Sequence, residues 1–215
     1  MFKKIKEAIK KAAEGPAPFD ASRFGDELAL QTEWTPCKPG GTNFKSHQLV
    51  EVRYDRMEFK ASTGMVLFSS LFIAVGGLMI LIPLIAGEDG GAIAFLSLMG
   101  LLFGGVGAWV LYSSTVPTVF DKTIGMFWKT RKTPDFYSHH ADTKDQVRLN
   151  NIYAIQLIAE YIRGDKQGYY SYELNLVMND GKRINVVDHG KKSVILKDAE
   201  TLSRFLNKPV WNAAC

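Results

Sequence analysis

The sequence predicts an α+β membrane protein, in which a two-helix transmembrane hairpin is inserted in a mainly antiparallel β-domain with a C-terminal capping helix. Three observations predict this class. Within the 215 residues, segments 61–87 and 90–120 contain no charged side chain. Apolar and polar residues alternate on both sides of these segments, which is typical of half-buried strands. One amphipathic helix is predicted near the end of the chain, where it can cover a sheet.

Each uncharged segment is long enough to cross a bilayer as a helix. A hydrocarbon core about 30 Å thick needs about 20 helical residues, and residues 65–85 and 92–112 each supply that length. A buried hairpin of a soluble protein is the alternative, but soluble helices need a polar face. We therefore predict a transmembrane helical hairpin over residues 63–114.

The positions of the basic residues predict how this hairpin is oriented. The loop between the two segments carries Glu88 and Asp89, whereas all 26 Lys and Arg residues lie before or after the two segments. The positive-inside rule therefore places the loop outside and both termini in the cytoplasm.

Small residues recur at helical spacing along each span. They are Ser70, Ala74 and Gly77 in the first span and Ser97, Gly100, Gly104 and Gly107 in the second. Antiparallel pairing with a turn of five or six residues places Gly77 near Gly100, and Ser70 near Gly107. Apolar helices in lipid associate through close backbone approach at such residues. The small residues thus either close the hairpin or, with Gly76 and Gly105 beside them, mediate self-association or docking of another helix.

The first 14 residues predict a basic amphipathic helix, because Phe2, Ile5 and Ile9 recur at helical spacing. The lysines on the rest of its surface are Lys3, Lys4, Lys6, Lys10 and Lys11. Such a helix suits an anionic membrane surface, although an ordinary solvated terminal helix has the same pattern. Residues 15–44 are rich in Pro, Gly and polar residues and predict an extended arm.

Residues 45–62 and 115–211 predict one cytoplasmic β-domain that the hairpin interrupts. The strand-like segments are 47–53, 57–61, 116–120, 126–130, 147–149, 152–161, 170–178 and 183–187. Two strands alone are marginal in water, so the two before the hairpin are expected to join the later ones. A helix near 197–206 ends the domain before Pro209.

The segment from Ser171 to Gly190, with Pro209, Val210 and Trp211 beyond it, is similar to the ends of uncharacterised bacterial two-span proteins. The whole layout resembles bacterial inner-membrane proteins with a pleckstrin-homology-like (PH-like) cytoplasmic domain, over residues 45–211. The resemblance implies a bacterial inner-membrane location, binding of protein or lipid, and no catalytic residues. In many such proteins the hairpin precedes the whole domain, whereas here strands lie on both sides of it.

One cluster of side chains resembles a metal site, namely His139, His140 and Asp142. A catalytic zinc ion usually has three protein ligands in fixed geometry, and this spacing matches no established motif. We therefore expect a solvated loop, no metal and no cofactor. The segment 188–190 is expected to be a turn before the last helix. Phosphate-binding and nucleophile-elbow motifs are absent from the sequence.

These patterns predict a non-enzymatic, membrane-anchored interaction or scaffold module on the cytoplasmic face of the inner membrane. Its expected partners are membrane lipid and either a protein partner or a second copy, as a homo-oligomer. The bases are spread out, which argues against nucleic acid. One alternative is an accessory or oligomeric channel-forming subunit of a larger membrane complex, and a second is a metal-dependent hydrolase.

Overall fold

The structure is a computed structural model that describes residues 19–134, 143, 145–164 and 167–214. The predicted basic helix of residues 1–14 lies outside these ranges. So do His139, His140 and Asp142.

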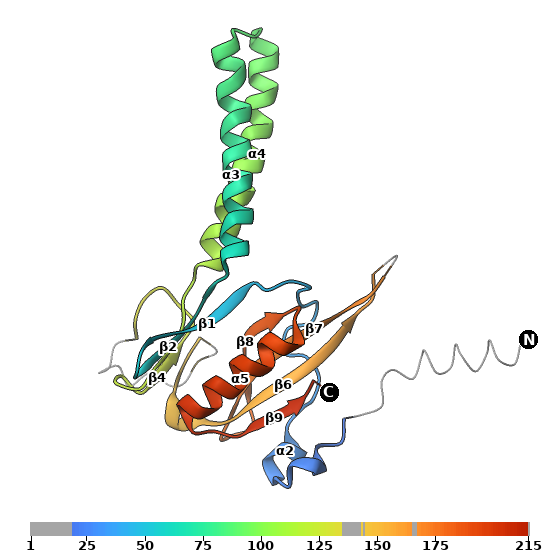
Figure 1. The fold of residues 1–215 in the computed structure, drawn as a ribbon, viewed down its shortest axis with the longest axis vertical. Helices are drawn as coiled ribbons and strands as arrows, with labels where there is room; N and C mark the ends of the chain where they lie inside the picture. The colour runs from blue at the N-terminus through green and yellow to red at the C-terminus, as the bar shows by residue number, and fades with distance from the viewer. Residues whose placement is uncertain (1–18, 135–142, 144, 165–166, 215) are drawn as a thin grey trace, which may run out of the picture.

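Two long apolar helices form a hairpin that projects from a β-domain (Figure 1). They are α3 (Thr63–Ala86) and α4 (Gly90–Ser114). The Ser62 side chain caps α3 by accepting a hydrogen bond from the Met65 amide, and Asp89 caps α4 in the same way. Gly87, with a φ of 68°, ends α3 in the left-handed conformation that favours glycine. Both helices are long and apolar enough to cross a membrane.

The hairpin is an insertion within one antiparallel sheet. This sheet has the order β1-β2-β3-β4-β5. Its strands are β1 (His47–Arg53), β2 (Arg56–Ala61), β3 (Thr118–Asp121), β4 (Met126–Trp128) and β5 (Gln146–Arg148). Strand β2 precedes α3 and strand β3 follows α4. The two strands pair with each other, with Phe59 opposite Thr118. Both ends of the hairpin are therefore fixed at one side of the sheet.

A second sheet has the order β8-β7-β6-β9. Its strands are β6 (Ile152–Ile162), β7 (Tyr169–Met178), β8 (Arg183–His189) and β9 (Val210–Ala213). Strand β9 was not predicted, and it pairs parallel to β6. Helix α5 (Lys192–Leu206) begins earlier than predicted and ends at Asn207, whose φ is 54°.

One apolar core joins both sheets and α5. Phe59 and Phe120 come from the first sheet, Leu157 from the second, and Ile195 and Leu202 from α5, and all five are fully buried. The strands before and after the hairpin thus belong to the same folded unit. The predicted α+β class, with antiparallel sheets and two long apolar helices, is confirmed.

The described part of the predicted extended arm is folded rather than extended. It contains η1 (Ala21–Phe24) and α2 (Glu27–Gln31), capped by the side chains of Asp20 and Asp26. Trp34 packs against Trp211 of β9, with ring centroids 6.1 Å apart. The aromatic residues of this segment are separated by polar ones. Its composition therefore does not predict the small apolar cluster that it forms.

Candidate functional site

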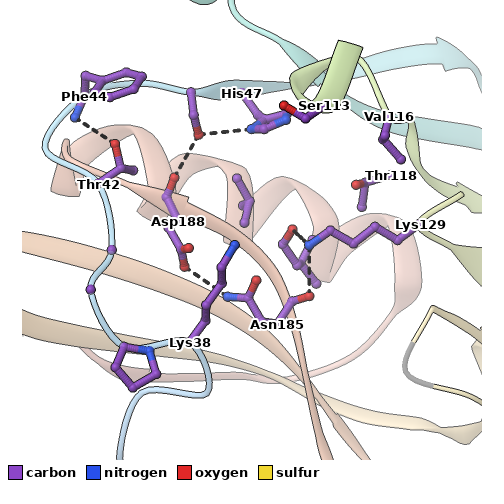
Figure 2. Close-up of a pocket in the computed structure, with 16 residues that line it drawn as sticks. Lys38, Thr42, Phe44, His47, Ser113, Val116, Thr118, Lys129, Asn185 and Asp188 are labelled. Carbon is purple, nitrogen blue, oxygen red and sulfur yellow. Dashed lines mark hydrogen bonds between the residues drawn. The ribbon is translucent and has the colours of Figure 1, made fainter. Parts of the chain in front are cut away.

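A cavity of about 370 Å³ lies where five parts of the chain meet at the base of the hairpin (Figure 2). We call it the junction cavity. Its lining includes Lys38, His47, Ser113, Lys129 and Asp188. These residues come from the arm, β1, the end of α4, the segment after β4, and β8. The cavity is therefore built by tertiary structure and not by one sequence motif.

His47 joins the hairpin to the β-domain. Its Nε2 lies 3.1 Å from the main-chain oxygen of Ser114, and its Nδ1 lies 3.0 Å from the hydroxyl of Ser46. Burial lowers the pKa of His47, and the positive charges of Lys129 and Lys38 act in the same direction. Because a carbonyl oxygen can only accept, Nε2 of the ring donates the hydrogen bond to Ser114.

Lys129 connects the two sheets. Its ammonium group donates hydrogen bonds to the main-chain oxygens of Asn185, at 3.3 Å, and Val186, at 2.9 Å. Burial lowers the pKa of this ammonium, and repulsion from Lys38 adds to the effect. Two carbonyl acceptors from β8 replace the water that the group loses.

Glu173 holds the arm against β7. Its carboxylate accepts hydrogen bonds from the amides of Cys37, at 2.9 Å, and Lys38, at 3.0 Å, and from the Asn185 side chain, at 2.8 Å. Only 3% of the residue is exposed. Burial raises the pKa of the Glu173 carboxyl, whereas these three donors lower it.

The Lys38 ammonium and the Asp188 carboxyl can each form further hydrogen bonds in the junction cavity. The Lys38 side chain extends into it (Figure 2), and among the described residues its ammonium makes no hydrogen bond or ion pair. The Asp188 carboxylate accepts one hydrogen bond, from the Asn185 side chain at 3.0 Å, while its main-chain oxygen accepts from the Ser46 hydroxyl, and burial raises the pKa of the carboxyl. The arrangement suits binding of a polar or anionic group beside the end of α4.

The structure places the hairpin contact on a different face of α3 from the one predicted. A Cβ added to Gly76 would lie 2.5 Å from the main-chain oxygen of Gly100 and 2.5 Å from the nitrogen of Gly104. A Cβ added to Gly107 would lie 2.8 Å from the oxygen of Ser69. Gly77, in contrast, has nothing within 4 Å of an added Cβ.

On α3 the structure buries Ser69 and Gly76, the neighbours of two of the predicted residues, Ser70 and Gly77. Ser70 and Ala74 are exposed, whereas Ser69 and Gly76 are buried. On α4 the predicted Gly100 and Gly107 are buried, and Ser97 and Gly104 are partly buried. Gly76 and Gly77 are equally small, so residue size alone does not distinguish the two faces.

A repeat of seven residues would have identified the correct face. The buried positions of α3 are Ser69, Gly76 and Pro83, and those of α4 are Gly100, Gly107 and Ser114. This spacing is typical of helices that pack at a small crossing angle. The same sequence-based reasoning also missed Lys38, Lys129 and Glu173, because the sheets bring them together from distant segments.

No family model, no curated protein and no solved structure matches the chain. Within the described ranges, no group of three or more His, Cys, Asp or Glu side chains is placed to hold a metal ion.

Proposed function

We propose that this protein is a membrane-anchored interaction module with a PH-like domain at the cytoplasmic face of a bacterial inner membrane. The observation that carries the proposal is the apolar outer surface of the hairpin. Of the apolar stretch of 18 residues in each helix, only 11% is buried. Leu67, Leu71 and Leu101 are each at least 60% exposed. Burial of one such side chain is worth about 1.5–3 kcal/mol, and lipid would supply it along the whole hairpin.

Aromatic and basic residues at the base of α4 support this placement. Trp109 and Tyr112 are 69% and 65% exposed and lie in the last turns of the helix. The guanidinium of Arg131 lies 4.2 Å from the centre of the Tyr112 ring and also donates to the Tyr112 main-chain oxygen. Such amphipathic rings and bases are typical of the interface between membrane and water.

The bonding in the junction cavity supports a role in binding and not in catalysis. His47 and Lys129 line the cavity, Glu173 holds the amide of its lining residue Lys38, and each of these three side chains bonds main-chain groups of another segment. Lys38 remains available to an anionic group of a partner. The hairpin would thus hold the junction cavity close to the inner leaflet, where membrane-bound partners diffuse.

Two experiments test the anchoring and its orientation. After cell lysis without detergent, the protein should sediment with the membranes and resist an alkaline carbonate wash. Reporters fused after Ser62, within residues 87–91 and after Cys215 should read cytoplasmic, external and cytoplasmic. Recovery of the protein in the supernatant would refute the anchoring.

An accessory or oligomeric channel-forming subunit is a second candidate function. Gly105 favours it, because this residue is exposed on α4 and an added Cβ meets nothing within 4 Å. Another helix can therefore approach the backbone there. In a Cys37→Ser, Cys215→Ser background, Gly105→Cys should give a cross-linked dimer in native membranes if the hairpins associate. A strictly monomeric product would remove this candidate.

A further inference from the structure

A second cavity, of about 620 Å³, lies at the other side of the hairpin base. We call it the α3 notch. Its lining includes Phe44, Lys45, Met65, Phe68 and Lys191. The loop before β1 supplies Phe44 and Lys45, the first turns of α3 supply Met65 and Phe68, and Lys191 precedes α5. Three separate segments therefore form one concave surface where the apolar hairpin meets the polar domain.

The apolar side of the α3 notch is open. Phe44 is 50% exposed and Phe68 is 54% exposed. Leu71 follows Phe68 by three residues and is 60% exposed, so it extends the same apolar surface by one helical turn. A ligand with an apolar chain can therefore lie along α3, away from the β-domain.

Neither lysine of the α3 notch has a carboxylate within ion-pair distance among the described residues, and Asp198 faces Lys45 only at longer range. Lys45 makes one hydrogen bond, at 3.4 Å, to the neutral side chain of Gln48. Lys191 is exposed and makes no side-chain bond to the start of α5. Within the described part of the chain, neither ammonium group forms an ion pair. An anionic ligand would supply the missing charge.

We propose that the α3 notch binds one anionic phospholipid of the cytoplasmic leaflet, a proposal that rests on the membrane anchoring proposed above. The phosphate would lie between Lys45 and Lys191, and one acyl chain would lie on Phe68 and Leu71. This order of groups matches that of the lipid, because the cations lie level with the first residues of α3 and the apolar residues follow along the helix. Basic pockets at the cytoplasmic end of membrane helices are suited to lipid head groups.

Native mass spectrometry of the full chain in detergent tests this proposal. The probes are dioleoyl phosphatidylglycerol, which is anionic, dioleoyl phosphatidylcholine, which is not, and glycerol 3-phosphate, which lacks acyl chains. We expect retention of phosphatidylglycerol alone. The Lys45→Gln, Lys191→Gln double variant should bind it about 25-fold more weakly, since each base near a lipid surface contributes roughly a factor of five.

A charge-matched control separates this site from general attraction by bases. Lys182→Gln with Lys197→Gln removes the same charge from exposed positions outside the notch and should leave binding unchanged. Phe68→Ala should weaken lipid binding while both lysines remain.

Three outcomes would overturn the proposal. They are equal binding of the two lipids, equal loss in both double variants, and binding of glycerol 3-phosphate as tight as that of the lipid. In each of these cases the anchoring survives if the protein still resists carbonate extraction. Recovery of the protein in the supernatant instead refutes the anchoring itself, so the two failures are distinguishable.

Discussion

The imidazole Nε2 of His47 on β1 lies 3.1 Å from the main-chain oxygen of Ser114, the last residue of α4. This contact spans 67 positions of the sequence and fixes the end of the hairpin on the β-domain. The carbonyl belongs to the last turn of a helix, where no amide of the helix can reach it. His47 therefore caps α4 from outside the helix and attaches the hairpin to the β-domain.

Removal of the His47 ring is expected to loosen this connection. His47→Ala leaves the Ser114 carbonyl without its donor and should lower the free energy of unfolding by about 1–3 kcal/mol. Chemical denaturation of the full chain in detergent measures the change. His47→Gln keeps an N–H donor and should recover part of the loss. The exposed Tyr54→Ala variant should have no effect, and equal stability of all three variants would contradict the role of the ring.

Gly76 and Gly77 offer a matched pair of substitutions in α3. A Cβ at Gly76 would lie 2.5 Å from main-chain atoms of α4, so Gly76→Ala must push the helices apart. We expect a loss of about 1–3 kcal/mol in stability, visible as a lower midpoint of thermal unfolding in detergent. Gly77→Ala meets no neighbour and should be neutral or slightly stabilising, because alanine favours the helix. Equal effects at both positions would mean that the predicted face, with Gly77, is as close to α4 as Gly76.

The sequence determines the elements of this fold better than it determines their contacts. The length of the uncharged segments predicts α3 and α4, and the alternation of apolar and polar residues predicts most strands. The alternation did not reveal β9, whose parallel pairing with β6 depends on the course of α5 before it. The sequence patterns also did not reveal the folded arm, where Phe24 and Trp34 pack on each other and on Trp211 of β9.

The residues of the candidate site were harder to predict from the sequence, for a related physical reason. Glu173 occupies a strand position, and its charge suggests a solvated residue. Its burial is compensated by amides of Cys37 and Lys38, more than 130 residues earlier in the chain. The expected turn at 188–190 was wrong for its first two residues, since Asp188 and His189 are the last residues of β8. Only the tertiary structure provides the partners that make such polar groups stable inside.

Glu173→Gln is expected to release the arm from β7. The substituted amide presents a donor where two main-chain amides and Asn185 all donate, so at least one of those contacts becomes repulsive. Burial raises the pKa of the Cys37 thiol to about 11, and exposure of the arm would lower it. In a Cys215→Ser background, Cys37 should therefore react several-fold faster with iodoacetamide at pH 8.

Glu160→Gln is the control for this experiment, because Glu160 accepts from the amide of Gly40 on the exposed side of the same arm. It should change the reactivity of Cys37 much less. If Glu173→Gln leaves the labelling rate at the wild-type value, the carboxylate does not hold the arm.

A buried pair of titratable groups between β8 and α5 predicts an unusual pH dependence of stability. His189 is fully buried, and its Nε2 lies 3.8 Å from Oδ2 of Asp198. Burial lowers the pKa of His189 to about 4 from 6.5, with Lys45 and His47 nearby acting in the same direction. Burial raises the pKa of Asp198 to about 6 from 3.8, against the opposing charges of Lys45 and Lys197.

These two shifts act in opposite directions on stability. The unfolded chain binds the His189 proton more tightly, so that group costs stability as the pH falls from about 6.5 to about 4. The folded chain binds the Asp198 proton more tightly, so that group adds stability as the pH falls from about 6 to about 4. Both states hold about one proton on the pair between pH 4 and pH 6, and its net contribution there is nearly constant.

Asp198→Asn should remove this compensation. The variant keeps an oxygen for its hydrogen bond to the main chain but takes up no proton, so only the cost at His189 remains. Its free energy of unfolding should fall by about 1 kcal/mol per pH unit, relative to wild type, between pH 6 and pH 4. Urea denaturation at several pH values measures this slope. Asp180→Asn, at an exposed turn, is the control and should follow wild type. A parallel pH profile for Asp198→Asn and wild type would contradict this exchange of one proton, because Asp198 would then titrate equally in the folded and unfolded chain.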